Sequence, residues 1–577
     1  MPGPACWPRL FCVFLFCSLS FACSDKANID PADIIFTGDN ILTVDLELTN
    51  TTGVAVRGDK IVFVGEAASA MNFYGPNTRL VELGDRALIP GFVDSHGHIA
   101  ATARFIDFAN VSAPPVGTVE NIDDLVDQLA EHLTAAPPAG DEWLVGYGYD
   151  DSLIAEQRHP NRDDLDKVSS TVPIFIAHVS GHLGVVNSAA LALLDFNKDT
   201  PDPPGGVIQR RQDGEANGIL EESAAGQVLW ARLADAAPDE FERMLRETIA
   251  YYAKHGITSI QDGGALANDI AAFRSAAEKK PFGADIAAYQ YMLPNDPDSL
   301  TIFEHDVEYS GGYRVAGIKF ALDGSPQGRT AWMSQPYTEL PHGAEADYVA
   351  YPTVEPDDYK AAVTQVIRRN IPVLVHANGD AAIELMIDGV ETATSDGIAR
   401  DHRSVAIHAQ LMRADQLDRA ATLGVIPSFF SSHTFFWGDW HLRSFGDERG
   451  NNISPTRWAI ERDVDFTIHN DTPVVPPDML RLIWATVNRE TRSGATIGPA
   501  QRLTVDEALY AATLGGAYQL FEEESKGSIT TGKQADLVIL SADPREVPSD
   551  TIKDIVVLET FSRGRLVFQK QINAVRK

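Results

Sequence analysis

The sequence predicts an α/β fold: a (β/α)8 TIM-like barrel joined to a composite β-sandwich that both ends of the chain build. Two observations indicate this architecture. Through the middle of the 577-residue chain, short apolar runs alternate with amphipathic helical stretches, as in a barrel whose functional residues follow the carboxyl ends of its strands. At both chain ends, short apolar runs are instead separated by turn residues, which is typical of a small sheet domain.

The first 22 residues have the composition of a secretory signal. One cation, Arg9, precedes an apolar run over 10–16, and small residues follow before Cys23. The run is too short for a comfortable membrane span. Cleavage before Cys23, making it the first mature residue, is typical of a bacterial lipoprotein; ordinary cleavage nearby and an uncleaved anchor are the alternatives. We expect an exported protein, in the periplasm or anchored by lipid to the outer membrane.

Cysteine content and charge limit the chemistry and the partners. All four cysteines lie in the leader, so a mature chain has no internal disulfide, cysteine nucleophile or zinc-thiolate site. A metal must then be held by His, Asp, Glu or modified Lys. The formal net charge of −34 is spread along the chain and disfavours nucleic acid and anionic membrane surfaces. We expect a small-molecule substrate, membrane contact only through the lipid anchor, and a homodimer as an option.

The β-sandwich is assigned to residues 32–90 and 525–570. The first segment contains "ADIIFTGDNILTVD" and "GVAVRGDKIVFVGE", and the second contains "GSITTGKQADLVIL" and "DIVVLETFSRGRLVFQK". These stretches read as short strands separated by tight turns. Because they share one pattern at opposite ends of the chain, we expect them to form one domain.

The barrel is assigned to residues 91–524. Its strands are predicted at 87–93, 256–264, 284–293, 315–324, 371–380, 404–412, 424–432 and 464–473. Residues from about 100 to 245 exceed one helical crossover and are interpreted as an insertion near the barrel mouth.

The first predicted barrel strand ends in "GFVDSHGHI", which places two histidines on either side of a glycine. Alternation along a strand would put His96 and His98 on the same side. Two imidazoles that converge at a buried strand end suit a divalent metal, although a hydrogen-bonded pair is the alternative. Other residues with metal-binding chemistry lie in or just after later apolar runs: Lys319, His376, His408 and Asp471.

With these segments the sequence resembles the amidohydrolase superfamily, and more specifically the YtcJ-like branch that includes N-substituted formamide deformylases. The resemblance extends from about residue 32 to residue 570. Its motifs here are "GFVDSHGH", "GHLGVVNSAAL", "GITSIQDGG", "IKFALDGSPQGRTA", "HANGDAAI", "AIHAQL", "HNDTPV", "QRLTVDEALYAAT" and "GSITTGKQADLVIL". It implies a metal-dependent hydrolase that acts on carbon–nitrogen bonds other than peptide bonds.

The resemblance also implies ligand roles for one or two divalent ions, with zinc as the expected metal. His96, His98 and Asp471 would bind one ion, and His376 and His408 a second. Lys319 stands where many members carry a carboxylated lysine that bridges the two ions; an ordinary ammonium, with a mononuclear site, is the alternative. The family often has Gly-Ser before the last aspartate, whereas this chain has His469 and Asn470.

The expected chemistry is hydrolysis of an amide-type C–N bond. A bound zinc-like ion lowers the pKa of its water to about 7 and polarises the scissile carbonyl. Asp471 would act as the general base and pass the proton to the leaving amine. The alternatives are a deaminase, a cyclic-amide hydrolase or an isomerase of the same superfamily, or a non-catalytic binding protein on the same fold.

Five residues are candidates for substrate binding. His182 of "SGHLGVVNS" is expected to reach the substrate or to fix its loop. Asp323, Gln327 and Arg329 follow Lys319 and would line the mouth, where Arg329 would meet a substrate carboxylate or form a surface ion pair. Trp437 of "FFWGDW" would belong to an aromatic wall or to the core.

Three further residues receive supporting roles. Asn187 is expected to cap the helix that follows it. Asp380 is expected to orient His376 from outside the metal-ligand set. His469 is interpreted, with the remaining histidines, as structural or solvated.

Overall fold

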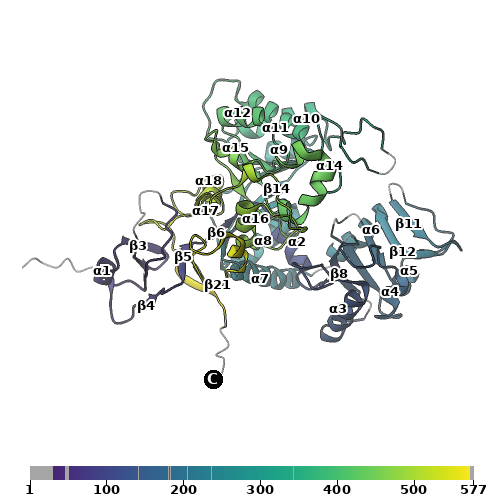
Figure 1. The fold of residues 1–577 in the computed structure, drawn as a ribbon, viewed down its shortest axis with the longest axis horizontal. Coiled ribbons are helices and arrows are strands. Elements are labelled where there is room, and N and C mark those ends of the chain that lie inside the picture. Colours follow the sequence, from purple (N-terminus) through teal and green to yellow (C-terminus); the bar gives the residue numbers. More distant parts are fainter. Residues whose placement is uncertain are drawn as a thin grey trace, which may run out of the picture.

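The structure is a computed structural model that describes residues 30–45, 51–140, 142–151, 153–179, 181, 183–203, 206–234, 237–341 and 344–571. The predicted signal segment, Cys23 and His182 lie outside the described residues. Among the helices of this described part, none is long and apolar enough to cross a membrane. Figure 1 shows a barrel at the centre, a β-region at one side and an insertion at the other.

Eight parallel strands form the central sheet, in the order β19-β18-β17-β16-β15-β14-β13-β6. They are β6 (Phe92–Asp94), β13 (Ile257–Ala265), β14 (Asp285–Tyr291), β15 (Tyr313–Ala321), β16 (Val373–Ala377), β17 (Val405–His408), β18 (Ile426–Phe429) and β19 (Thr467–Ile468). The first and last strands meet at their ends, because the Ser95 hydroxyl donates to the Ile468 carbonyl at 3.2 Å. This arrangement confirms the predicted (β/α)8 class.

Helices pack around the central sheet. They include α2 (Ile99–Phe105), α7 (Pro238–Lys254), α8 (Ala267–Lys279), α9 (Pro297–Ile302), α10 (Pro356–Arg368), α11 (Asp380–Thr394), α12 (Ala414–Leu423), α13 (His433–Phe436), α14 (Gly438–Gly450), α15 (Thr456–Ile460), α16 (Met479–Asn488), α17 (Val505–Ala511) and α18 (Leu514–Gln519). In α10, Pro356 occupies the first turn, Asp357 and Asp358 follow it, and Arg368 stands in the last turn. These positions match the helix dipole.

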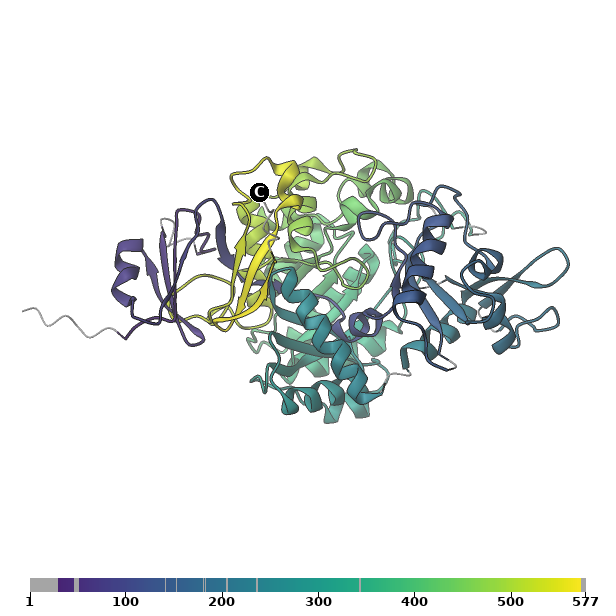
Figure 2. The same cartoon turned by 90° about the horizontal axis from the view of Figure 1, so that it is seen from below.

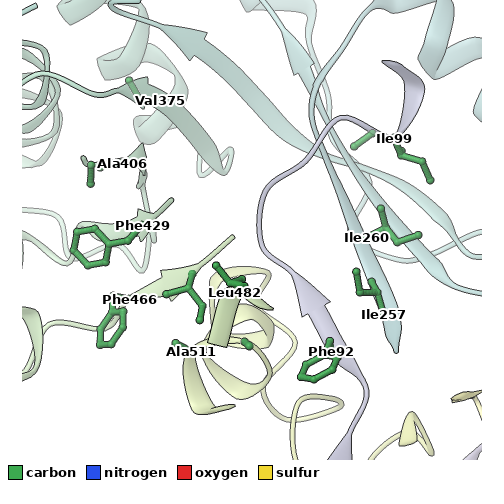
Figure 3. Close-up of a cluster of buried hydrophobic side chains, with 14 of the residues drawn as sticks. Phe92, Ile99, Ile257, Ile260, Val375, Ala406, Phe429, Phe466, Leu482 and Ala511 are labelled. Carbon is green, nitrogen blue, oxygen red and sulfur yellow. The ribbon is translucent and has the colours of Figure 1, made fainter. Parts of the chain in front are cut away.

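The main hydrophobic core lies between the strands and these helices. Figure 3 shows part of it: Phe92, Ile99, Ile257, Ile260, Val375, Ala406, Phe429, Phe466, Leu482 and Ala511. Phe92 and Phe429 come from strands, and Leu482 and Ala511 from helices, so residues distant in sequence share one packed layer. Burying an aliphatic or aromatic side chain of this size contributes roughly 1.5–3 kcal/mol.

The first predicted strand is divided at Gly91, and this corrects the prediction of one strand over 87–93. β5 (Ala87–Pro90) pairs with β20 (Leu537–Leu540) in a sheet outside the barrel, whereas β6 pairs with β13. A Cβ on Gly91 would lie 2.2 Å from the Thr258 hydroxyl oxygen, so only glycine allows this approach. Pro90 has no amide hydrogen with which to extend a ladder.

Two four-stranded sheets form the β-region, with the orders β3-β2-β1-β4 and β22-β21-β20-β5. Their remaining strands are β1 (Ile34–Thr37), β2 (Gly53–Arg57), β3 (Lys60–Gly65), β4 (Arg79–Glu82), β21 (Val557–Ser562) and β22 (Arg565–Gln569). Phe36 and Val54 of the first sheet share a buried cluster with Leu537 and Phe561 of the second. Figure 2 shows these purple and yellow strands side by side, so both chain ends contribute to the region.

A six-stranded sheet, β11-β12-β10-β9-β8-β7, forms the insertion. Its elements are β7 (Ala109–Asn110), α3 (Ile122–Ala135), β8 (Leu144–Tyr149), α4 (Arg162–Asp166), β9 (Ile174–His178), β10 (Leu183–Val186), α5 (Ser188–Leu193), β11 (Gly206–Arg210), β12 (Ala216–Glu222) and α6 (Ser223–Ala234). The Asn187 side chain accepts from the Ala190 amide at 2.9 Å, which confirms it as the cap of α5.

Candidate metal centre

The His96-Gly97-His98 segment lies in the loop between β6 and α2, so its histidines are not on the strand as predicted. They still converge. His98 Nε2 lies 3.1 Å and His96 Nε2 3.5 Å from Oδ1 of Asp471. The ligand atoms of these three residues all lie within 4.8 Å of one another. Two backbone hydrogen bonds hold the loop of the two histidines against the segment of Asp471. His98 N donates to Thr472 O at 2.7 Å, and Asp471 N donates to His96 O at 3.2 Å.

The neighbouring strand β13 fixes the ring of His96. Its Nδ1 lies 3.1 Å from Oε1 of Gln261, and in the tautomer that donates this bond the Nε2 lone pair faces Asp471. Gly263 leaves space for the ring, because a Cβ there would lie 2.0 Å from Cε1 of His96. The sequence analysis missed Gln261, although the glycine pair after it in "GITSIQDGG" indicates a close approach to this strand.

Lys319 on β15 lies beside His96. Its side chain is buried, with Nζ 3.3 Å from His96 Nε2. Burial lowers the pKa of Lys319 to about 7, and the charge of Asp471 opposes this only in part. At neutral pH a large fraction of this amine is therefore uncharged, which is the form that reacts with CO2.

His376 and His408 form the second group of imidazoles, at the ends of β16 and β17. Nδ1 of His376 lies 3.1 Å from Nε2 of His408. On its other side, His376 Nε2 lies 3.0 Å from the Gly324 carbonyl and 3.1 Å from the amide nitrogen of Asn378. The His408 and His96 rings lie 5.5 Å apart, which joins the two groups into one centre.

The Asp471 carboxylate is buried next to both groups. Burial alone would raise the pKa of Asp471, but the hydrogen bond and charge of His98 outweigh it, and the pKa lies below its ordinary value. Asp471 therefore stays ionised near neutral pH. A neighbouring carboxyl, Asp94, is fully buried, and neither of its oxygens has a hydrogen-bond partner among the described residues. Burial and the charge of Asp471 raise the pKa of Asp94 well above its ordinary value.

Asp323 and its neighbours hold the loop under His376. Asp323 accepts from the backbone amides of Trp332, Asn378 and Gly379 at 2.8–3.0 Å, so it organises a buried loop. Its Oδ1 lies 3.5 Å from His376 Nε2, and burial raises the pKa of Asp323 to about 7. These contacts give Asp323 the role that the sequence analysis expected of Asp380.

Asp380 itself accepts from Ser334 and Arg413 at the start of α11, away from the imidazole of His376. The expectation that it orients His376 is therefore wrong. The reason is local: Asp380 begins a new helix, where its carboxylate turns toward neighbouring donors.

The other described residues that were predicted to bind substrate, Arg329, Gln327 and Trp437, each contact different neighbours. Arg329 pairs with Glu339 and lies over the Trp440 ring, 4.4 Å from its centroid, which matches the ion-pair alternative. Gln327 has a buried Oε1 without a hydrogen-bond partner in the described part of the chain. Trp437 joins α13 and α14, with its ring 4.5 Å from His433. Phe430 connects this aromatic group to the centre, 6.0 Å from His408.

A second group of candidate ligands lies in the insertion. The parallel strands β8 and β9 end together and bring Asp150, Asp151 and His178 within 4.8 Å by their ligand atoms. His178 Nε2 lies 3.1 Å from Asp151 Oδ1. From the sequence, His178 is interpreted as structural or solvated.

The residues of the barrel centre fit a divalent metal. Imidazole nitrogens and carboxylate oxygens are the donors that zinc and similar ions take in proteins. In His96, His376 and His408, one ring nitrogen lies within 3.2 Å of a polar atom of a neighbouring residue outside the ligand set, which leaves the other nitrogen available to an ion. The fold and this donor set define a metal-dependent hydrolase on a (β/α)8 barrel.

Comparison with known proteins gives the family. The sequence profile of the amidohydrolase family matches residues 79–568, and the chain belongs to this family. It is similar to the N-substituted formamide deformylase of Arthrobacter pascens, with 27% identity over 93% of this chain and 98% of the relative. It is also similar to YtcJ, an amidohydrolase-family protein of Bacillus subtilis (strain 168), with 26% identity over 93% and 99% of the two chains.

A solved structure agrees with the fold. The crystal structure of an uncharacterised metal-dependent hydrolase from Pyrococcus horikoshii OT3 superposes with a TM-score of 0.71 at 21% identity, covering 89% of this chain and 99% of that one. The match to the family profile confirms the predicted family. The chain is a metal-dependent hydrolase of this family that acts on carbon–nitrogen bonds.

Proposed function

We propose that this chain is an exported amidohydrolase that cleaves an amide-type C–N bond in a small molecule, with Asp471 as the general base. The proposal rests above all on one observation. A buried, ionised carboxylate stands within 3.5 Å of two imidazoles and beside a second imidazole pair. A base in this position can take a proton from water and return it to a leaving amine.

The residues of the centre would hold one or two divalent ions, with zinc as the proposed metal. His96, His98 and Asp471 form one set of donors, and His376 and His408 the other. A divalent ion bound there supplies Lewis acidity toward a substrate carbonyl and makes water more acidic. Asp471 then moves the proton, while the backbone bonds of its loop hold the carboxylate in place.

Lys319 supports a site with two ions. Its uncharged amine can react with CO2 to form a carbamate, with release of one proton, and the product is an anionic oxygen donor. The amine lies 3.3 Å from His96 Nε2 and within the field of Asp471. In this position a carbamate would supply an oxygen ligand to an ion held by either group of histidines.

The substrate proposal is an N-substituted amide with an apolar group. Phe430, His433 and Trp437 form a run of rings that begins beside His408, with neighbouring centroids 4.3 and 4.5 Å apart. Such rings provide apolar contact area. The name of the Arthrobacter pascens relative, an N-substituted formamide deformylase, supports the same choice.

Export is proposed from the leader alone. Arg9, the apolar run over 10–16 and the cysteine at position 23 favour a lipoprotein signal over an uncleaved anchor. Cells grown with labelled palmitate should label the wild type but not Cys23→Ser, and an unlabelled wild type would contradict lipid anchoring.

The activity is tested by turnover of N-formyl amines, N-acyl amino acids and cyclic amides. We expect release of amine by the wild type and loss of turnover in Asp471→Asn. Asp478→Asn is the control, because Asp478 caps α16 and pairs with Arg481 at 3.3 Å, and it is not a residue of the metal centre. Turnover by Asp471→Asn at the rate of the control would contradict the general-base role. Activity only on amino-purines or cyclic amides would favour the alternative chemistries.

A further inference from the structure

A chain of buried hydrogen bonds runs from the backbone of the β6 loop to the imidazole of His408. It begins at Gln519, whose Nε2 donates to the Ser95 carbonyl at 2.8 Å. A carbonyl can only accept, so this contact fixes which end of the amide is nitrogen. Gln519 Oε1 therefore faces Thr467, and the Thr467 hydroxyl donates to it at 2.8 Å.

The single proton of each hydroxyl decides the next step. The Thr467 hydroxyl is placed to donate to both Gln519 Oε1 and Ser428, at 2.8 and 2.7 Å, but it has a single proton. The amide oxygen of Gln519 cannot donate, so that proton serves Gln519, and in the contact with Thr467 it is Ser428 that donates. Ser428 has then used its own proton as well. Its 2.8 Å contact with Nδ1 of His469 needs a proton from the imidazole. His469 is thereby assigned as the Nδ1–H tautomer.

The same reasoning fixes the ring of His408. With its proton on Nδ1, a neutral His469 offers only a lone pair at Nε2, which lies 3.2 Å from Nδ1 of His408. His408 must donate there, so its Nε2 has no proton. That nitrogen lies 3.1 Å from Nδ1 of His376.

The hydrogen bonds from Gln519 to His408 are buried, so the fold and not the solvent decides which atom donates in each. Ser428, Thr467 and His469 are 0% exposed, and Gln519 is 1% exposed. The assignment concerns the neutral ring, which is the ordinary form of an imidazole above about pH 6.5, so the measurements are made above pH 7. Every hydrogen bond from Gln519 to His408 is made with a proton of the protein itself, without water.

We propose that His469 is a positioning residue that holds His408 in the Nδ1–H tautomer and so presents the His408 Nε2 lone pair to the metal centre. The sequence analysis interpreted His469 as structural or solvated. The inference rests on the proposed metal centre, yet it concerns the protons of the protein itself. Partners that orient metal-binding histidines commonly change metal affinity by about 10–100-fold.

The direct test reads the tautomer in metal-free protein. The chain is labelled with 15N-histidine, and the His408 signals are assigned by their absence in His408→Gln. Long-range proton–nitrogen correlations should show a protonated Nδ1 and an unprotonated Nε2 in the wild type. A proton on Nε2 of His408 would overturn the proposal, whatever the metal affinity.

The second test measures zinc affinity by competition with a chromogenic chelator. His469→Leu cannot accept a proton and should bind zinc about 10–100-fold more weakly. His469→Gln should stay within about threefold of the wild type, because its amide oxygen can accept the same proton. Wild-type affinity in His469→Leu would overturn the proposal.

His402 offers a matched control next to the start of β17. It is also buried and makes a 2.8 Å contact with a serine, Ser404, but it points to Leu423 and away from the centre. His402→Leu should leave zinc affinity unchanged, and an equal loss in both leucine variants would show a general packing effect and overturn the proposal. Should His469→Leu fail to fold, Ser428→Ala must alter the His408 signals, and unaltered signals would count against it.

The two proposals can fail separately. If the wild type shows the expected tautomer but binds no zinc, the metal-dependent function is wrong, and the role of His469 in presenting His408 to a metal is wrong with it. If the wild type binds zinc while His408 carries its proton on Nε2, the function stands and the positioning role fails.

Discussion

Gly263 on β13 tests how closely the strand holds the imidazole of His96. A Cβ at this position would lie 2.0 Å from Cε1 and 2.3 Å from Nδ1 of the ring. Ordinary van der Waals contact begins at 3.4 Å, so in Gly263→Ala the ring must move by about 1.4 Å. Movement of that size would separate Nδ1 from Gln261 and turn Nε2 away from Asp471.

Two estimates of the free-energy loss in Gly263→Ala agree. Overpacking of a buried site costs about 1–3 kcal/mol, and loss of a partner that orients a metal ligand weakens binding by about 10–100-fold, which corresponds to about 1.4–2.7 kcal/mol. We therefore expect Gly263→Ala to fold but to bind zinc at least tenfold more weakly, measured by chelator competition.

The adjacent glycine provides the control. A Cβ on Gly264 would lie 3.3 Å from the nearest atoms of His98, which requires a shift of only a few tenths of an ångström. Gly264→Ala should therefore bind zinc nearly as the wild type does. Normal zinc binding by Gly263→Ala, or an equal loss in both variants, would refute the reasoning.

Three further predictions concern charge and protons. Asp471→Asn should keep most of the bound metal but lose turnover by about 10²–10⁴-fold, measured as kcat; near-normal kcat would contradict the base role. Lys319→Met should bind less metal per chain and lose any dependence on bicarbonate, and unchanged metal content would exclude a bridging carbamate. Burial lowers the pKa of His441 to about 3, whereas the unfolded imidazole takes up a proton below pH 6.5. Stability should therefore fall with falling pH from 6.5 towards 3, and His441→Leu should reduce that slope in urea unfolding by up to about 1.4 kcal/mol per pH unit; an unchanged slope would contradict this.

Several strands of the barrel were predictable because each is a continuous apolar run with its chemistry at one end. β16 and β17 show this, since His376 and His408 follow directly from "VLV" and "VAI". The division at Gly91 was not predictable, because it depends on the approach of Thr258, a residue distant in sequence. One apolar run can pass through two sheets, and its pattern does not show where.

The ligand candidates were easier to find than the residues that orient them. A histidine after a buried strand is visible in one sequence. Gln261, Ser428 and Gln519 are ordinary polar residues whose roles arise from contacts made only in the fold. Arg329 is conspicuous in the sequence as a cation near Lys319, and in the fold it forms the ion-pair alternative, with Glu339.

Metal content per chain tests the account most directly. A soluble form that begins after Cys23 would be purified without chelator and with bicarbonate, and its metals measured by elemental analysis beside His96→Ala. We predict one or two equivalents of a transition metal, with zinc expected, and loss of metal in the variant. Two equivalents would support a carboxylated Lys319. A wild-type protein that binds no metal, even after incubation with zinc or manganese, would contradict the account and favour a non-catalytic binding protein.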